Sequence, residues 1–493
     1  MTVPLFLKST RAKFSFICLI FLLLRAFFYF LSPTELGDTY NFFHFSDALS
    51  HFIYPVTEKR LPLFSLILIP GLLFSDPVVY GRVLVTGISL LTLFLVYRYS
   101  FSLFKKSNFS LASVALCALS PFYFYWSSRV LTEALFSFLV LLAFYIFYRK
   151  KYFALGIICA LAAITRYEGV ILMISFIPYL LIKKDFRNFV IFISLPVFAL
   201  GLVFIRLLNS PYLLEPSGFH YSPWSFFIIP AGLLFIFGII PHRIPSLNLI
   251  SKCSVKKMIE YSPFALFIIF SLSLFFLWVA ALPRLFCFLI PLLSVPAGRF
   301  ILSQNNDKKI VNILIWCLCL GFLIYFRQNY RFQFLFLDKG FALVFLLISF
   351  SAIISLIALN KKSVAFTLAT LGMVVSLFSY SFYFKDVYIS VYKSLQFANN
   401  LEGKIIYSDE TGLTGWYLKN KNIVYFDDTE WPERVKSLKS NGVRYAIVTN
   451  EFDELRRLVF IEKKSNRSEV KMIFEKKIND RGYMRYTRIY EII

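Results

Sequence analysis

Long apolar runs separated by short charged connections dominate the first 384 residues of the chain. A helix needs about 20 apolar residues to cross a bilayer, so the pattern predicts about thirteen transmembrane helices. The fifth and sixth runs are short, which indicates tilted or broken helices. The predicted spans are 13–31, 78–97, 109–126, 131–148, 152–165, 168–182, 188–207, 224–241, 262–281, 285–302, 310–326, 340–359 and 364–384.

One further apolar run, Leu61–Phe74, does not fit a simple span because it contains Pro62, Pro70 and Gly71. We expect it to form a loop helix that lies at the membrane surface or dips into it. Together with a helix expected over Tyr40–His51, it places outer-loop helices within residues 38–76.

The pattern changes after residue 384, where short apolar strands alternate with polar helical stretches such as Glu430–Ser440. This alternation predicts a small C-terminal α/β domain over 385–493, outside the membrane, after a transmembrane domain over 1–384. The expected strands are 404–408, 422–426, 444–449, 470–476 and 483–491.

Composition supports this division of the chain. Hydrophobic residues make up 58% and charged residues 16%, whereas a soluble domain has about 45–50% and 25%. A soluble enzyme, a disordered chain and a disulfide-stapled module are therefore excluded. The net charge of +24 could indicate nucleic-acid binding, but residues 385–493 hold 20 basic and 16 acidic residues. The other 32 basic and 12 acidic residues precede them, which is typical of juxtamembrane lysines.

The connections between spans alternate between lysine-rich and acidic. Under the positive-inside rule the lysine-rich connections are cytoplasmic. With an odd number of spans, the amino terminus is then cytoplasmic and the C-terminal domain extracytoplasmic. We expect a multi-pass protein of a prokaryotic plasma membrane. The lysine-rich connections include Lys105–Lys106, Arg149–Lys151, Lys183–Lys184, Lys308–Lys309 and Lys361–Lys362.

The first outer loop carries the most informative carboxylate. Pro33 and Gly37 end the first span, so Asp38 is held near the outer membrane surface. A carboxylate beside low-dielectric surroundings can act as a general base when its pKa is tuned. The alternative is structural, with Asp38 or Thr39 as the N-cap of the following helix.

Single arginines accompany acids in the later outer segments. Arg129 and Glu133 are four residues apart, as expected for neighbours on one helix face. Arg166 and Glu168 share the next outer turn, and Arg284 stands alone between two spans. Guanidinium groups suit phosphate recognition, which favours a phosphorylated lipid as ligand. An orienting salt bridge is the structural alternative.

Metal binding has little support. His44, Asp47 and His51 share a helix face and could form half a metal site, but an interfacial helix with aromatic anchors explains them as well. The sequence contains no P-loop, dinucleotide-binding glycine motif, His-Glu-x-x-His or Gly-x-Ser-x-Gly. No metal ligand or cofactor is therefore assigned.

The order of these features resembles the GT-C superfamily of membrane glycosyltransferases, closest to the protein O-mannosyltransferase and aminoarabinose transferase type. The resemblance covers roughly residues 12–302, with a looser match in the tail. The segments that carry it are Gly37–Tyr40, Leu61–Phe64 with Tyr80–Val83, Ala118–Pro121 with Arg129–Glu133, Thr165–Gly169 and Pro283–Phe286.

The resemblance implies an inverting transfer of a hexosyl or pentosyl group on the extracytoplasmic face. The donor would be a polyprenyl- or dolichyl-phosphate sugar, and the acceptor a hydroxyl of a protein, lipid or glycan. Asp38 matches the family's catalytic carboxylate, and Glu133 its second acidic loop. Arg129, Arg166 and Arg284 would bind the donor phosphate, with Tyr40, Tyr167 and Glu168 in support. The resemblance leaves room for a divalent metal, but no motif indicates one.

Two departures limit the resemblance. The family's first loop often has an Asp-Glu pair, whereas Asp38 is followed by Thr39, so a second carboxylate must come from elsewhere, for example Glu133. Gly415-Trp416-Tyr417 does not match the Trp-Trp-Asp-Tyr-Gly signature of oligosaccharyltransferases.

A transporter or lipid-carrier flippase is the main rival function. It would favour inverted repeats and midplane charges; the sequence has no repeat, and Arg25 is its clearest charge within a span. A scaffold for the tail domain is a third alternative.

Overall fold

A computed structural model gives the structure of the chain. It describes residues 9–55, 58, 60–209, 255–277, 287–303, 374, 377–378, 388–407, 416–418, 423–425, 435–450, 470–480 and 483–493. The predicted spans 224–241, 310–326 and 340–359, most of 364–384, and Arg284 lie outside the described residues.

The chain divides into two compact units, described one at a time below. The helical unit comprises Met1–Phe27 and Ile53–Ser381, and the tail unit comprises Phe28–Phe52 and Phe382–Ile493. The predicted division at residue 384 assigns the first outer loop to the transmembrane domain. The compact units instead group its first part, up to Phe52, with the tail and leave the rest in the helical unit.

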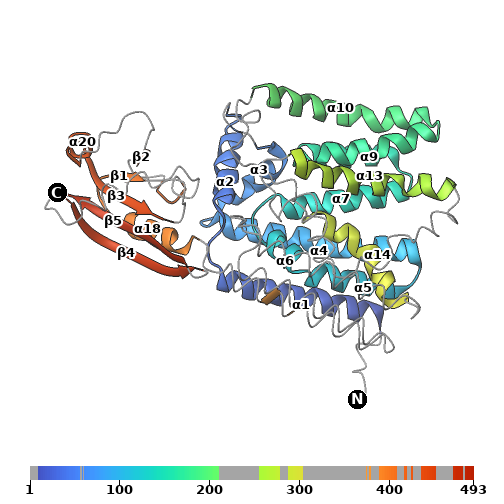
Figure 1. Cartoon of the computed structure of the whole chain (residues 1–493), viewed down its shortest axis with the longest axis horizontal. Helices are drawn as coiled ribbons and strands as arrows, with labels where there is room; N and C mark the ends of the chain where they lie inside the picture. Colours follow the sequence, from blue (N-terminus) through green and yellow to red (C-terminus); the bar gives the residue numbers. More distant parts are fainter. Residues whose placement is uncertain are drawn as a thin grey trace, which may run out of the picture. The chain divides into compact units, whose positions relative to one another are not determined.

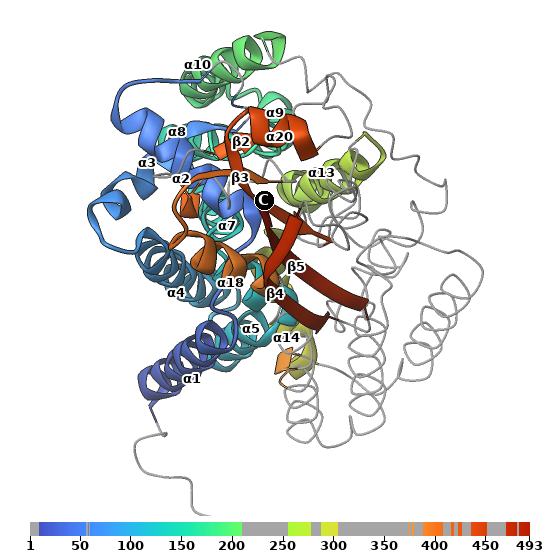
Figure 2. The same ribbon diagram turned by 90° about the vertical axis from the view of Figure 1, so that its left-hand side faces the viewer.

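Helices make up the described part of the helical unit, and most of them run side by side in Figure 1 and are seen nearly end-on in Figure 2. The first helix, α1, continues into the tail unit at its carboxyl end. Apart from two short pieces described below, its described helices are α1 Thr10–Leu31, α4 Pro77–Phe104, α5 Ser107–Leu119, α6 Pro121–Ser128, α7 Glu133–Tyr148, α8 Tyr152–Ala163, α9 Gly169–Ile182, α10 Phe186–Asn209, α13 Val255–Leu277 and α14 Leu289–Ser303.

Within the described residues, α1 and α4 are each long and apolar enough to cross a membrane. The successive helices α5 and α6 qualify together as one span bent by 60°. The bend lies at Ser120-Pro121, where proline cannot donate to the preceding turn. These elements match the predicted spans 13–31, 78–97 and 109–126. A polytopic helical membrane protein is therefore supported, while the count of about thirteen stays a prediction.

Small residues let the helices pack closely. Gly298 of α14 lies so close to α5 that an added Cβ would meet Ser113 Oγ at 2.2 Å and the Ser113 backbone nitrogen at 2.5 Å. The Ser113 hydroxyl also donates to the backbone carbonyl of Val295, at 3.1 Å. Small residues at helix contacts are typical of membrane bundles, where close backbone approach replaces the hydrophobic driving force.

The predicted loop helix is present as two short pieces, α3 Pro62–Leu68 and the 3-10 helix η2 Ile69–Leu73. Proline at N1 begins α3, and the Pro70-Gly71 pair falls where the helix tightens. The next helix, α4, is capped by Asp76, whose Oδ1 accepts from the Val78 N–H at 3.0 Å. The α3 amide of Leu63 donates to the carbonyl of Ile164, at 3.2 Å.

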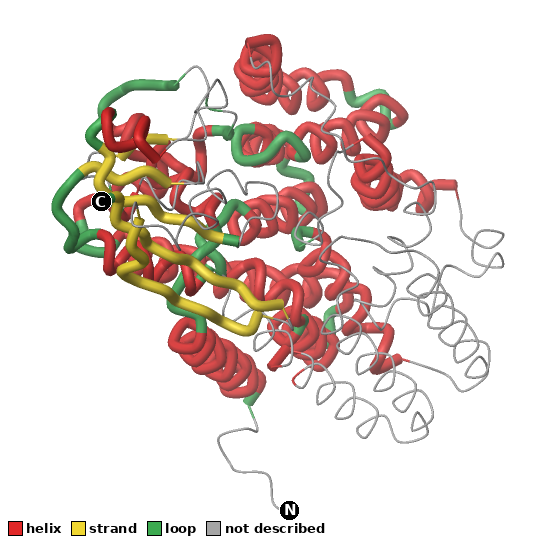
Figure 3. The backbone as a smooth tube through the Cα atoms, turned by 60° about the vertical axis from the view of Figure 1, so that its left-hand side comes forward, coloured by secondary structure: helices red, strands yellow, loops and turns green. Residues whose placement is uncertain are grey.

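The tail unit contains a five-stranded sheet of order β2-β1-β3-β5-β4, drawn in yellow in Figure 3. Strands β1, β2 and β3 are mutually parallel, while β5 runs antiparallel to both β3 and β4. All five expected strands are present, and β4 is longer than expected. The strands are β1 Lys404–Tyr407, β2 Ile423–Tyr425, β3 Val443–Thr449, β4 Val470–Asp480 and β5 Tyr483–Ile492.

Apolar side chains of the sheet and of helix α20, Val435–Ser440, form one core. A second helix, α18 Ile389–Ala398, contacts the antiparallel strands β4 and β5. Its Ser390 hydroxyl lies 3.1 Å from the Thr487 hydroxyl, and its carboxyl end stacks Phe397 on Phe474, with ring centroids 4.6 Å apart. The core side chains are Ile406, Leu438, Val443, Ala446, Val448, Val470, Tyr490 and Ile492.

Candidate active site

The connection between α6 and α7 carries the first group of predicted site residues. Helix α6 ends at Ser128, Arg129 is extended, and α7 begins at Glu133. Arg129 and Glu133 therefore do not share a helix face as the four-residue spacing predicts, because the helix breaks between them. Both side chains are buried. Glu133 sits in the first turn of α7, where the helix dipole favours a carboxylate.

The turn between α8 and α9 carries the second group. Thr165 and Arg166 both donate their backbone N–H to the carbonyl of Ala162, which folds the chain back at the end of α8. A Cβ added at Gly169 would meet the Ala162 backbone at 2.3–2.4 Å. The turn therefore has room only for glycine at residue 169. Arg166 and Glu168 lie in this same closely packed turn.

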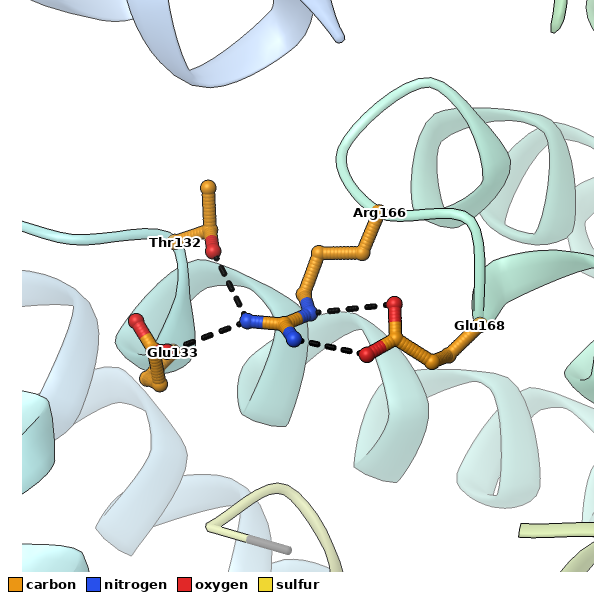
Figure 4. A network of polar contacts seen from close by, with 4 residues as sticks. All are labelled: Thr132, Glu133, Arg166 and Glu168. Carbon is orange, nitrogen blue, oxygen red and sulfur yellow. Dashed lines mark hydrogen bonds and ion pairs between the residues drawn. The ribbon is translucent and has the colours of Figure 1, made fainter. Parts of the chain in front are cut away.

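Arg166 joins the two groups (Figure 4). Its Nη1 donates to Thr132 Oγ1 and to Glu133 Oε1, both at 3.1 Å. Its Nη2 and Nε donate to the two carboxylate oxygens of Glu168, at 2.6 and 3.3 Å. These four residues, Thr132, Glu133, Arg166 and Glu168, are called the ion-pair cluster below.

Electrostatics favour the charged form of Arg166. Burial disfavours the charged guanidinium, but the neighbouring Glu168 and Glu133 outweigh it and raise the pKa of Arg166. Charges taken out of water are stable only when they are paired with good geometry. A forked, two-point contact such as Arg166 with Glu168 meets this condition, and it also fixes the orientation of the planar group.

Arg129 lies beside this cluster in sequence but is oriented by an aromatic ring. Its Nη2 donates to the Tyr125 hydroxyl at 3.2 Å, and its guanidinium carbon lies 4.9 Å from the centre of the Tyr125 ring. The side chain is 1% exposed. A buried guanidinium held by a cation–π contact keeps its charge, which is what recognition of an anionic ligand requires.

Arg25 ties α1 to the same region of the helical unit. Its guanidinium donates to Thr86, to Ser89 at 2.9 Å, and to the Ser127 hydroxyl at the end of α6. It also lies 4.6 Å from the centre of the Phe21 ring. The sequence marks Arg25 as a charge within a span, but not its partners. Ser127 stands two residues before Arg129, so Arg25 helps to place the α6–α7 connection.

Asp38 and Tyr40 lie in the tail unit, on helix α2, Gly37–Ser50. The N-cap of α2 is Leu36, without a side-chain cap, and Asp38 is in the first turn. The capping alternative for Asp38 or Thr39 is therefore wrong, because the helix starts earlier than the sequence predicts. Asp38 is half-buried, and the amino end of a helix favours its charged form.

Helix α2 contacts the tail through aromatic side chains. The hydroxyls of Tyr40 and Tyr417 lie 3.2 Å apart, and their ring centroids 5.5 Å apart. The Trp416 ring lies 5.4 Å from both Phe43 and His44. These five residues are called the aromatic cluster below. In the sequence, Trp416 and Tyr417 stand out only because they fail to match the Trp-Trp-Asp-Tyr-Gly motif, and no local signal links them to residues 40–44.

Tyr167 and the histidines of α2 are the other residues that the sequence marks as candidates. Tyr167 is half-buried in the α8–α9 turn, next to Arg166. Within the described part of the chain, no three His, Cys, Asp or Glu side chains gather as a metal site. The Nδ1 atom of His51 lies 2.9 Å from the backbone carbonyl of Asp47, an ordinary contact at the end of a helix.

Comparison with known proteins gives a family-model match over part of the chain and a shared fold. Residues 65–213 match the family model described as dolichyl-phosphate-mannose-protein mannosyltransferase. No curated protein matches the chain by sequence. Among solved structures, ArnT from Cupriavidus metallidurans is similar both in the apo state and bound to undecaprenyl phosphate. Each match has 13% identity and a TM-score of 0.62, and covers 96% of this chain and 97% of the other.

The family match spans the helices and turns that carry Arg129, Glu133, Arg166 and Glu168. The match to ArnT extends over nearly the whole chain and shows a common fold. Both findings agree with the resemblance that the order of the sequence motifs indicates: residues 65–213 match a mannosyltransferase family model, and the chain shares its fold with ArnT.

Proposed function

We propose that the protein transfers a sugar from a polyprenyl- or dolichyl-phosphate donor to an acceptor hydroxyl on the extracytoplasmic face of the membrane. The observation that carries the proposal is the largely buried ion-pair cluster, with Arg129 close to it in the chain, inside the segment that matches the mannosyltransferase family. The similar ArnT structure, which is bound to undecaprenyl phosphate, supports a polyprenyl phosphate as the lipid part of the donor.

In the proposed reaction Asp38 is the general base. Its carboxylate accepts the proton of the acceptor hydroxyl while that oxygen attacks the anomeric carbon. The bond from the anomeric carbon to the phosphate oxygen breaks, and the lipid phosphate leaves from the opposite face of the sugar. The configuration at the anomeric carbon is therefore inverted. The leaving phosphate carries the negative charge, and fixed cations stabilise it.

The three arginines have different proposed roles in the reaction. Arg129 and Arg284 keep the predicted role of binding the donor phosphate. The guanidinium of Arg166 donates to Glu133 and Glu168, so its proposed role is to hold these carboxylates in place. Glu133 then supplies the second carboxylate that the first loop lacks, and Tyr40, Tyr167 and Glu168 support the arrangement.

Replacing Asp38 tests the proposal. Cells lacking the gene are complemented with the wild type, Asp38→Asn or the control Asp47→Asn, which changes an exposed carboxylate on the same helix. Mass spectrometry of the cell-envelope glycans is the measurement. Loss of a general base costs about 10²–10⁴-fold in rate, so Asp38→Asn should lose the sugar addition that the wild type and Asp47→Asn restore.

Three results would contradict the proposal. Full modification with Asp38→Asn, at equal protein levels, would remove the catalytic assignment. Cells that lack the gene but keep an unchanged glycan profile, while a lipid-linked sugar no longer reaches the outer leaflet, would favour the flippase. Cleavage of the tail by protease added to the cytoplasmic face of sealed vesicles would overturn the proposed orientation.

A further inference from the structure

The tail unit joins two segments that are far apart in the chain. Residues 28–52, with helix α2, form one compact unit with residues 382–493. The Tyr40–Tyr417 hydrogen bond spans 377 positions. A contact at this separation has a large ordering cost, so it needs several favourable interactions to persist. The aromatic cluster provides them, since each paired ring adds to the area that the others bury.

One side of α2 makes these contacts. Tyr40, Phe43 and His44 are spaced i, i+3 and i+4, which places them on a single helix face. Asp38 precedes Tyr40 by two residues, so its Cα lies about 160° around the helix axis from that of Tyr40. The face that holds the tail and the position that carries Asp38 are therefore on opposite sides of α2. Rotation of the helix about its axis would move Asp38 directly.

The contacts continue from α2 to the sheet. The Tyr417 ring packs edge-on against Tyr392 of α18, with centroids 5.3 Å apart. Helix α18 is in turn fixed to the sheet through the Ser390 contact with Thr487 and the Phe397 stack on Phe474. Tyr40 and Phe43 are fully buried, so this is a packed connection. A side chain in such a position transmits a displacement to its neighbours instead of absorbing it.

We propose that Trp416 and Tyr417 are positioning residues for the transfer reaction: they set the rotation of α2 about its axis and thereby the direction in which Asp38 faces. The inference rests on the proposed function for the role of Asp38, but the docking of α2 on the tail stands independently of it. The Trp-Tyr pair thus has a task unrelated to the oligosaccharyltransferase signature that it fails to match.

Hydrogen exchange of the purified full-length protein in detergent tests the docking. Trp416→Ala removes a ring that contacts both Phe43 and His44. Aromatic contacts of this size change an equilibrium by roughly tenfold, so amide exchange over residues 37–50 should rise by about that factor. Exchange over α7 to α9 should stay unchanged. Trp416→Phe should restore the slow exchange of α2, and Met484→Ala, an exposed side chain on β5, is the control.

The glycan assay described above tests the consequence. Trp416→Ala should lower modification by about tenfold at equal membrane levels of protein, and Trp416→Phe should restore it. Unchanged exchange in α2, or full modification despite a loosened α2, would overturn the inference. Failure of the proposed function has a different signature: Asp38→Asn would keep full modification while the exchange results for Trp416→Ala still hold, and Trp416 and Tyr417 would then anchor α2 without a part in catalysis.

Discussion

The two units hold their charged site residues by different means. In the helical unit, charged hydrogen bonds hold the ion-pair cluster together, and no directly bonded pair is more than 34 positions apart. In the tail unit, the helix that carries Asp38 is held by the aromatic cluster, whose Tyr40–Tyr417 pair spans 377 positions. The first arrangement depends on charge and on local turns. The second depends on packing and on the fold of the tail.

This difference explains what each arrangement tolerates. A buried ion pair loses much of its stability when one partner is removed, since the other charge remains without compensation. An aromatic contact loses only its own area and leaves no charge behind. We therefore expect the ion-pair cluster to fail abruptly under substitution and the aromatic cluster to weaken by degrees.

Replacing Arg166 has the largest expected effect. Arg166→Met leaves the largely buried Glu133 and Glu168 together without their cation, and breaking a buried pair in this way costs up to about 3–5 kcal/mol. Arg166→Lys keeps the charge but loses the fork that binds Glu168 at two points, so it should fall between Arg166→Met and the wild type. Thermal unfolding of the purified protein in detergent measures the difference.

Arg444 provides the matched control for this prediction. Its ion pair with Glu491 is longer, at 3.4 Å, and its side chain is 56% exposed. Exposed pairs contribute about 0–1 kcal/mol, so Arg444→Met should leave the unfolding temperature almost unchanged. Equal effects of Arg166→Met and Arg444→Met would show that the ion-pair cluster does not stabilise the helical unit.

Sequence patterns predict the ion-pair cluster better than the aromatic cluster for a physical reason. Arg129, Glu133, Arg166 and Glu168 are exceptional because charges are costly next to long apolar runs, so each one is visible in the sequence. Which of these charged residues pair with one another is harder to predict from the sequence. The spacing of Arg129 and Glu133 predicts one helix face, but the helix breaks between them, and Glu133 forms an ion pair with Arg166 that the spacing does not indicate.

No comparable feature of the sequence identifies the residues of the aromatic cluster. The chain contains 60 Phe and 29 Tyr residues, so no pattern distinguishes Tyr40 or Tyr417 from other aromatic side chains. The strands of the tail were predictable because apolar and polar residues alternate locally. Which distant helix joins them was not, because that depends on tertiary packing alone. The grouping of residues 28–52 with the tail is therefore a structural finding.

Crowding the α8–α9 turn should have the next largest effect. Gly169→Ala would place a Cβ 2.3–2.4 Å from the backbone of Ala162, and overpacking of this kind costs about 1–3 kcal/mol. Because the same turn carries Arg166 and Glu168, sugar transfer should fall together with stability. Thermal unfolding and the glycan assay measure the two effects.

Gly87 of α4 is the control, since a Cβ there would meet nothing within 4 Å. Gly87→Ala should be neutral or slightly stabilising, by up to about 1 kcal/mol, because alanine favours the helix. If Gly169→Ala behaved like Gly87→Ala, the turn would not need glycine, and another feature would have to place Arg166.

Titration of Tyr40 should have the smallest effect. Burial, with Tyr417 and Glu35 as further causes, raises the pKa of Tyr40 well above its ordinary value of 10.0. A raised pKa in the folded state means that the protonated phenol is the form that folding stabilises. Its contribution is complete below the pKa of the unfolded chain and is lost as pH rises towards the folded pKa. The hydrogen bond with Tyr417 should contribute about 1 kcal/mol below pH 10.

Tyr40→Phe separates this contribution from the other groups that titrate in the same range. At pH 8 the wild type should be more stable than Tyr40→Phe, and by about pH 11 the difference should shrink or change sign, because only the unfolded wild type gains a free phenolate at residue 40. Thermal unfolding of both proteins at the two pH values measures it. A difference that grows with pH would mean that the phenolate of Tyr40 is accommodated in the fold, and the tail would then hold α2 by something other than a buried neutral contact.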